Sequence, residues 1–123
     1  DITILTYSRM RHHCLKAVET LEKEGIDVEL IDLISLKPFD MKTISKSVKK
    51  THRVIIVEEC MKTGGIAAEL MSLITENCFD DLDAPISVVN SMNIPMPYSA
   101  DLEDQVVPNT ERVLNRINDL IGL

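Results

Sequence analysis

Four segments with the pattern of a β-strand alternate along this chain with segments that have the pattern of an α-helix. The strand-like segments are short and rich in isoleucine and valine, and they are residues 2–7, 28–34, 54–57 and 86–89. The helix-like segments are residues 10–24, a segment after Asp40, residues 66–76 and a segment after Pro108. Strict alternation of this kind predicts a three-layer α/β domain, with a mostly parallel sheet covered by helices on both faces.

The length of 123 residues is that of one domain, so we expect a single domain over residues 1–123. The longest purely apolar run has four residues, at 54–57, which excludes a membrane-spanning helix by sequence. The chain opens inside a strand pattern at Ile2 and without methionine. We therefore expect the domain to be a fragment of a longer polypeptide.

Charge is distributed unevenly, with a net charge of −7 for the whole chain. No lysine or arginine occurs between Thr63 and Glu111, and Arg112 and Arg116 are the last basic residues. This imbalance disfavours a nucleic-acid partner, because phosphate contacts need a basic surface. Residues 76–104 hold seven acidic side chains, which we expect to repel one another unless a basic partner offsets them.

Three cysteines at wide spacings, Cys14, Cys60 and Cys78, make no disulfide framework and fit a reducing compartment. His12, His13 and Cys14 are adjacent, but neighbouring helical residues point about 100° apart and do not converge on one metal ion. We therefore expect no metal site in this chain.

Gly64 and Gly65 separate a strand pattern from a helix pattern. Free backbone amides at such a helix start can bind a phosphate or a carboxylate, which makes the pair a candidate anion site. The alternative is a tight turn that needs the backbone freedom of glycine, because the further glycines and the lysine of phosphate-binding loops are missing.

Glu58 and Glu59 end the third strand pattern, at the edge of the sheet where α/β proteins gather functional groups. Adjacent strand residues face opposite sides, so the two carboxylates do not form an acid–base dyad. We expect a structural or interface role for them and identify no catalytic residue in the chain.

An ordered series of short segments along nearly the whole chain resembles one known family. The segments are Ser8-Arg9, Cys14-Leu15, Pro108 and residues 28–33, 36–40, 47–51, 57–59, 64–69, 82–85, 95–98 and 102–104. Together they resemble the transketolase C-terminal-like domain of 2-oxo acid dehydrogenase beta subunits, in particular that of the pyruvate dehydrogenase decarboxylating component. The resemblance implies strand order second, first, third, fourth, with an antiparallel edge strand before Asp1.

The resemblance also implies cofactors and partners for the full enzyme. Thiamine diphosphate and magnesium would bind outside this fragment, and the isolated chain would be inactive. The implied partners are an alpha subunit, a second beta subunit and the dihydrolipoyl acyltransferase core, whose subunit-binding domain is basic in many members. We expect interface residues among Glu58, Glu59, Pro95, Pro97, Tyr98, Asp101, Glu103 and Asp104.

Other hypotheses remain open from the sequence. The chain is also similar to branched-chain 2-oxo acid dehydrogenase beta subunits and to other transketolase-family enzymes. A free-standing regulatory domain that binds an anion at Gly64 and Gly65, and a small enzyme that uses Glu58 or Glu59, are the remaining alternatives. The family implies the bacterial cytoplasm, or the mitochondrial matrix or plastid of a eukaryote.

Overall fold

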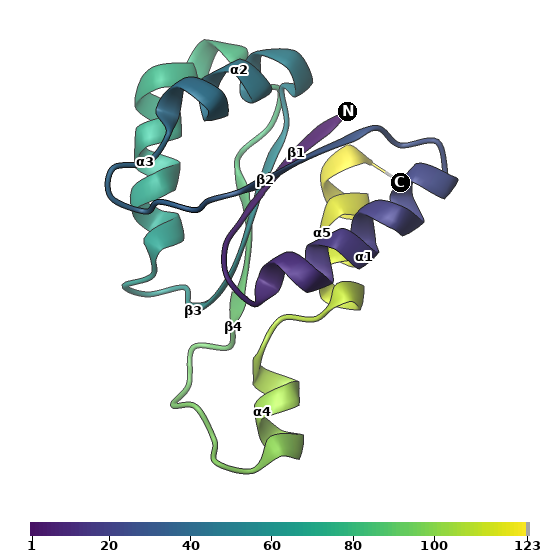
Figure 1. The fold of residues 1–123 in the computed structure, drawn as a ribbon, viewed down its shortest axis with the longest axis vertical. Helices are drawn as coiled ribbons and strands as arrows, with labels where there is room; N and C mark the ends of the chain where they lie inside the picture. Colours follow the sequence, from purple (N-terminus) through teal and green to yellow (C-terminus); the bar gives the residue numbers. More distant parts are fainter. Residues whose placement is uncertain (123) are drawn as a thin grey trace.

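A computed structural model describes residues 1–122, which form a four-stranded, fully parallel sheet between helices (Figure 1). The elements are β1 (Ile2–Thr6), α1 (Met10–Lys23), β2 (Val28–Asp32), α2 (Met41–Thr51), β3 (Val54–Met61), α3 (Ile66–Cys78), the 3₁₀ helix η1 (Phe79–Asp81), β4 (Ser87–Ser91), α4 (Ala100–Val106) and α5 (Thr110–Ile121). The strand order β2-β1-β3-β4 confirms the predicted order.

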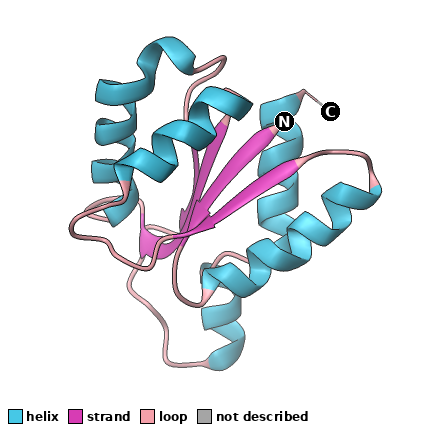
Figure 2. Cartoon of the chain, turned by 45° about the horizontal axis from the view of Figure 1, so that its top comes forward, coloured by secondary structure: helices cyan, strands magenta, loops and turns pink. Residues whose placement is uncertain are grey.

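Two hydrophobic clusters lie on the two faces of the sheet. Ile2 and Ile4 of β1 pack with α1 and α5, whereas Leu5 of β1 packs with α2 and α3. This alternation along one strand gives the three layers visible in Figure 2, with helices on both sides of the strands. The predicted three-layer α/β class is confirmed. Within residues 1–122, no helix is long and apolar enough to cross a bilayer.

All four strands differ from the sequence prediction at one or both ends, and β4 covers Ser87–Ser91 rather than residues 86–89. β2 ends at Asp32 rather than at residue 34, and Ile34 is 94% exposed in the following loop. β3 continues beyond residue 57 to Met61, because β4 keeps pairing with it through an irregular register that ends with Met61 opposite Ser91. The longer strand places Glu58 inside the sheet.

A protruding arm, defined here as residues 92–107, leaves the layers after β4 and returns at α5. It hangs below the rest of the molecule in Figure 1 and contains α4. The segment 94–98 with its two prolines is irregular, as predicted. The sequence did not predict α4, which is short and holds its only buried side chain at Val106, so its apolar periodicity is weak.

Candidate functional site

The carboxylate of Glu58 lies fully buried at the carboxyl end of the sheet, with an exposed fraction of 0%. Glu59, the next residue, points to the surface, where its Oε1 lies 3.4 Å from Nη1 of Arg9. The two carboxylates therefore face opposite sides of β3, which confirms that they form no dyad. The burial corrects the expectation that Glu58 contributes to an interface, since no partner can contact it at the surface.

Three donors from three separate elements converge on Glu58. The Ala67 N–H, at the start of α3, donates to Oε2 at 3.0 Å, and the Tyr7 hydroxyl, after β1, donates to the same oxygen at 3.1 Å. The Asn90 amide, on β4, donates to Oε1 at 2.7 Å. Glu58 thus ties β3 to β4, α3 and the β1–α1 connection, which are segments far apart in the sequence.

From the sequence, the start of α3 is a candidate binding position for an external anion. In the structure, the carboxylate of Glu58 occupies this position. Gly65 is the residue immediately before α3, and Ala67 is one of the helix's free N–H groups. A carboxylate at this end also complements the helix dipole. Of the two alternatives for Gly64 and Gly65, an anion site or a tight turn, the position of the candidate anion is taken by the carboxylate of Glu58.

The two glycines serve different purposes. Gly64 has a φ of +76°, a left-handed conformation that favours glycine. Gly65 has an extended backbone with a φ of −80°, but a Cβ there would collide with the Glu58 carboxylate and would lie 2.6 Å from the Met61 carbonyl oxygen. Gly64 thus fits the predicted tight turn, whereas Gly65 leaves space for the buried carboxylate.

Burial raises the pKa of Glu58 above its ordinary value of 4.5, because a charged carboxylate loses its water shell. Hydrogen bonds from Ala67, Tyr7 and Asn90 favour the charged form and offset part of this rise. Burial also raises the pKa of Tyr7, and its contacts with Cys60 and Glu58 add to the effect. Tyr7 therefore stays protonated and donates to Glu58.

Replacing Glu58 by glutamine is expected to change how stability depends on pH. Because the pKa of Glu58 is higher in the folded than in the unfolded state, its favourable contribution is fully present below 4.5 and is lost as pH rises through the folded-state pKa. Urea titrations from about pH 4 to about pH 8 should show the parent losing stability relative to Glu58→Gln as pH rises. A difference in unfolding free energy that is constant over this range would contradict the prediction.

Arg9 joins two of the expected interface residues. Its guanidinium lies 3.4 Å from the Glu59 carboxylate and 3.7 Å from that of Glu103 on α4. These exposed ion pairs add little stability, but they link the base of the protruding arm to the end of β3. The exposed Cys60 follows Glu59 on β3, and its sulfur lies 3.6 Å from the Tyr7 hydroxyl oxygen.

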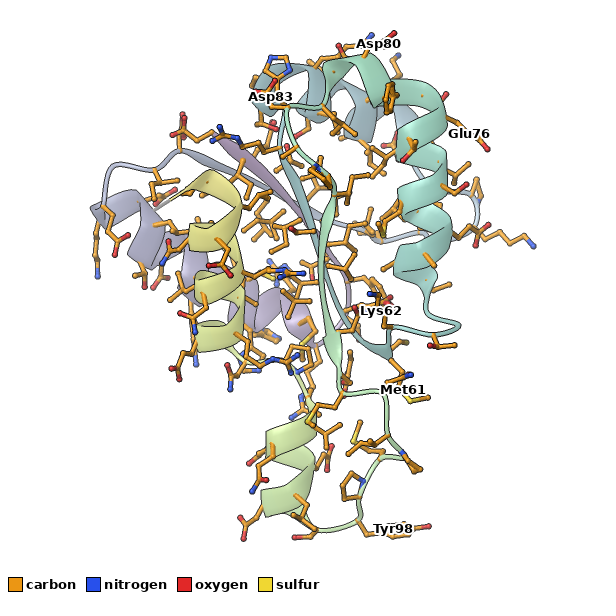
Figure 3. All side chains as sticks on the ribbon, turned by 180° about the vertical axis from the view of Figure 1, so that it is seen from behind. Met61, Lys62, Glu76, Asp80, Asp83 and Tyr98 are labelled. Atoms are coloured by element: carbon orange, nitrogen blue, oxygen red, sulfur yellow. The ribbon has the colours of Figure 1, made fainter. Side chains whose placement is uncertain are left out.

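The remaining expected interface residues lie on the protruding arm. Tyr98 is fully exposed at its tip, as Figure 3 shows, and Pro95 is exposed while Pro97 is half-buried. Asp101 and Asp104 are exposed on α4. Exposed apolar side chains accompany them: Met92, Ile94, Met96 and Leu102. A surface of this kind is typical of contacts with other protein, and the assignment of these residues to an interface stays a prediction.

The acidic residues that are close in sequence do not form one surface. Glu76, Asp80 and Asp83 lie around the end of α3, whereas α4 with Asp101 and its neighbours lies at the opposite end of the molecule (Figure 3). Glu103 also has a partner in Arg9. The sequence analysis expected seven neighbouring acidic side chains to repel one another. The fold instead divides them into two groups at opposite ends of the molecule (Figure 3).

The described residues offer no group of ligands for the magnesium ion that accompanies thiamine diphosphate. The start of α3 is filled by Glu58, and residues 1–122 contain no group of three or more His, Cys, Asp or Glu side chains that could hold a metal ion. The adjacent residues His12, His13 and Cys14 do not converge on one point, because Cys14 is buried in the core while His12 is exposed.

The family model described as "Transketolase, C-terminal domain" matches residues 1–113. The chain belongs to this family. Its relatives include proteins named "Pyruvate dehydrogenase E1 component subunit beta" from Chaetosphaeridium globosum, 54% identical over 120 residues, and from Porphyra purpurea, 54% identical over 122 residues. A relative from Oryza sativa subsp. japonica, named as the chloroplastic subunit beta-3, is 53% identical over 119 residues.

These matches cover 98%, 99% and 97% of this chain, but only 37%, 37% and 30% of the relatives. The chain therefore spans about a third of their length. A solved structure named "Split gene transketolase, inactive beta4 tetramer" is similar with a TM-score of 0.85 and 25% identity, covering all of this chain and 40% of that one. The transketolase C-terminal fold inferred from the sequence is confirmed.

The functional residues that sequence reasoning missed are Tyr7 and Asn90, the side-chain donors to Glu58. Neither lies in a motif, and only the strand order brings the ends of β1, β3 and β4 together. The carboxyl ends of parallel strands lie at the same end of a sheet. Polar residues at the ends of three strands were therefore the sequence signal that could have indicated this cluster.

Proposed function

We propose that this transketolase-family chain is the C-terminal domain of a pyruvate dehydrogenase E1 beta subunit and acts there as an assembly platform without catalytic residues of its own. The observation that carries the proposal is the identity of 54% to proteins of that name over nearly the whole chain. The fold alone would not distinguish this subunit from other transketolase relatives, since fold does not imply function.

The placement of side chains supports a platform rather than a reaction centre. Glu58, the buried carboxylate, is used to join elements of the chain itself. The surface features are the exposed apolar side chains of the protruding arm and the acidic α4. In this proposal thiamine diphosphate and magnesium bind in other parts of the enzyme, and no catalytic step passes through residues of this chain.

The partners in this proposal are the alpha subunit, a second beta subunit and the dihydrolipoyl acyltransferase core. The structural neighbour is named as a beta4 tetramer, which supports contacts between copies of such subunits. The chloroplastic name of the Oryza sativa relative supports a plastid location among the compartments expected from the family.

A domain exchange tests the proposal. This 123-residue chain replaces the matching C-terminal segment of the Porphyra purpurea beta subunit, which is coexpressed with its alpha subunit. We expect the hybrid to assemble and to decarboxylate pyruvate with thiamine diphosphate, because subunit contacts depend on the surface residues of this domain. Size-exclusion chromatography and an artificial electron acceptor assay measure both properties.

The matched control is a hybrid that carries the corresponding domain of the split-gene transketolase, which has the same fold at 25% identity. We expect this control to fold, as judged by circular dichroism, but not to assemble with the alpha subunit. A folded hybrid with our chain that behaves like the control would refute the assignment to pyruvate dehydrogenase.

Replacing Asp101, Glu103 and Asp104 together by serine in the full-length subunit is expected to slow association with a basic subunit-binding domain. The three carboxylates lie on α4, an ordered helix, so little entropy is lost when they meet a partner. The slowing should shrink as salt rises, since exposed charges are screened within about 8 Å at physiological ionic strength. Surface plasmon resonance gives the rates, and an unchanged rate with an unchanged salt dependence would show that α4 makes no such contact.

The group of carboxylates at the other end of the molecule provides the control. Asp80, Asp81 and Asp83 lie in η1 and the loop after it, far from the protruding arm. Replacing them by serine removes the same charge, so a specific role of α4 predicts that this control binds at the rate of the parent.

A further inference from the structure

The last two basic residues of this acidic chain lie together in one cavity. Arg112 and Arg116 are the only lysines or arginines after Lys62, and all three line a cavity of about 440 Å³. Among the described residues that line it there is no acidic side chain. A cavity of this size is in the range of small-molecule sites.

The cavity lies along the free edge of the sheet. β4 pairs with β3 alone, and its other edge faces outward between α3 and α5, as Figure 3 shows from behind. The start of α3 and residues of β4 form the walls, and α5 contributes Arg112 and Arg116. The two arginines are four residues apart, so they project from the same face of the helix.

Arg112 is held in place before any ligand arrives. Its Nη2 donates to the Asn90 carbonyl at 2.7 Å, and its Nη1 donates to the Val106 carbonyl at 3.3 Å. These bonds neutralise no charge, because both acceptors are backbone carbonyls. Within residues 1–122, no carboxylate forms an ion pair with Lys62, Arg112 or Arg116. The three cations of this cavity are therefore not held in ion pairs with carboxylates of the described residues.

The walls of the cavity are partly apolar and partly polar. Met71 of α3, Val88 of β4 and Ile86 just before β4 offer an apolar surface. The side chains of Asn90 and Asn93 add amides near the cations. The amide of Asn90 also donates to Glu58, whose carboxylate lies behind the wall. An acidic residue, Asp119, borders an adjoining cavity of about 330 Å³ that Arg112 and Arg116 share.

We propose that this cavity binds a small organic anion whose phosphate or carboxylate group meets Arg112, Arg116 and Lys62, and whose carbon part lies on the apolar wall. Arginine matches both headgroups because its planar N–H groups can bond two oxygens at once. A second and larger cavity, of about 690 Å³, is bordered by Asp80 and Asp83 and offers no cation to an anion among the described residues that line it. The proposal does not rest on the proposed subunit role, since the cavity is built from this chain alone.

Titration of the ¹⁵N-labelled 123-residue chain with phenyl phosphate, benzoate and neutral benzyl alcohol tests the proposal. We expect the two anions to shift amide signals at the start of α3, in β4 and in α5, and the alcohol to leave them unchanged. Whichever anion binds more tightly identifies the preferred headgroup. Affinity should fall as salt is added.

Arg116→Gln and Lys62→Gln are the test variants, because both side chains are exposed and their loss leaves the anchoring bonds of Arg112 intact. Each should weaken binding about tenfold, as expected for the loss of one charge-assisted hydrogen bond. Lys42→Gln, on α2, is the matched control and should bind like the parent. Absence of shifts with both anions, or equal affinities of parent and Arg116→Gln, would overturn the proposal.

Discussion

Replacing Glu58 by alanine is expected to lower the free energy of unfolding by about 3–5 kcal/mol, because three donors lose the buried acceptor that they share. The substitution leaves the Ala67 N–H, the Tyr7 hydroxyl and the Asn90 amide without their acceptor. Each buried donor that loses its acceptor costs about 1–3 kcal/mol. The loss of the unfavourable burial of the carboxylate itself returns part of this, so the cost should not reach the sum of the three donors.

Urea denaturation followed by circular dichroism measures the change, with Glu59→Ala as the control. Glu59 is the adjacent residue, carries the same charge and pairs with the exposed Arg9, so its replacement should cost less than about 1 kcal/mol. If the two variants were equally stable, Glu58 would contribute no more than a surface carboxylate, and the three hydrogen bonds would carry no weight in folding.

The architecture of this chain is readable from the sequence because each of its layers has a periodic signal. The strands β1 and β3 are runs of branched apolar residues, and α1 places Cys14, Ala17 and Leu21 on one buried face. The one α-helix that the sequence did not predict, α4, is the one whose apolar periodicity is weak. α4 has seven residues and buries only Val106, so no repeating apolar face marks it.

The interior of the candidate site was less predictable, although every residue type in it is visible in the sequence. Strand alternation correctly separates Glu58 from Glu59, but it does not decide which of the two faces the core. That depends on β3 continuing past residue 57 through its irregular pairing with β4. The end of α3 nearest Gly65 is likewise recognisable as a place for an anion, whereas no local pattern indicates a carboxylate of the same chain as its occupant.

The cavity lined by Lys62, Arg112 and Arg116 was not predicted from the sequence, for a different reason. Arg112 and Arg116 stand out as the last bases of an acidic chain, and Lys62 lies 50 residues before the first of them. Their meeting depends on the position of β4 at the sheet edge between α3 and α5, a property of topology rather than of local pattern. Local sequence patterns do not show that α3 and α5, which are far apart in the sequence, lie on either side of β4.

Replacing Gly65 by alanine is expected to destabilise the fold by about 2–4 kcal/mol, although alanine accepts its backbone conformation without strain. The φ of −80° is ordinary for any residue, so the cost comes from space alone. The added Cβ would meet the Glu58 carboxylate and would lie 2.6 Å from the Met61 carbonyl oxygen. Glu58 must then move away from the Ala67 N–H, and the buried network around it is disturbed by one methyl group.

Two comparisons separate this steric effect from the usual cost of losing a glycine. Gly64→Ala adds a methyl group where nothing lies within 4 Å, and its expected cost of about 1–2 kcal/mol arises from the left-handed φ of +76°. Asparagine tolerates that conformation, so Gly64→Asn should restore most of the loss, whereas Gly65→Asn should not. In a Glu58→Ala background the colliding carboxylate is absent, and the cost of Gly65→Ala should fall to about half, with the Met61 carbonyl as the remaining obstacle. Equal costs of Gly65→Ala in both backgrounds, measured by urea denaturation, would show that Gly65 is required for a reason other than the space that Glu58 occupies.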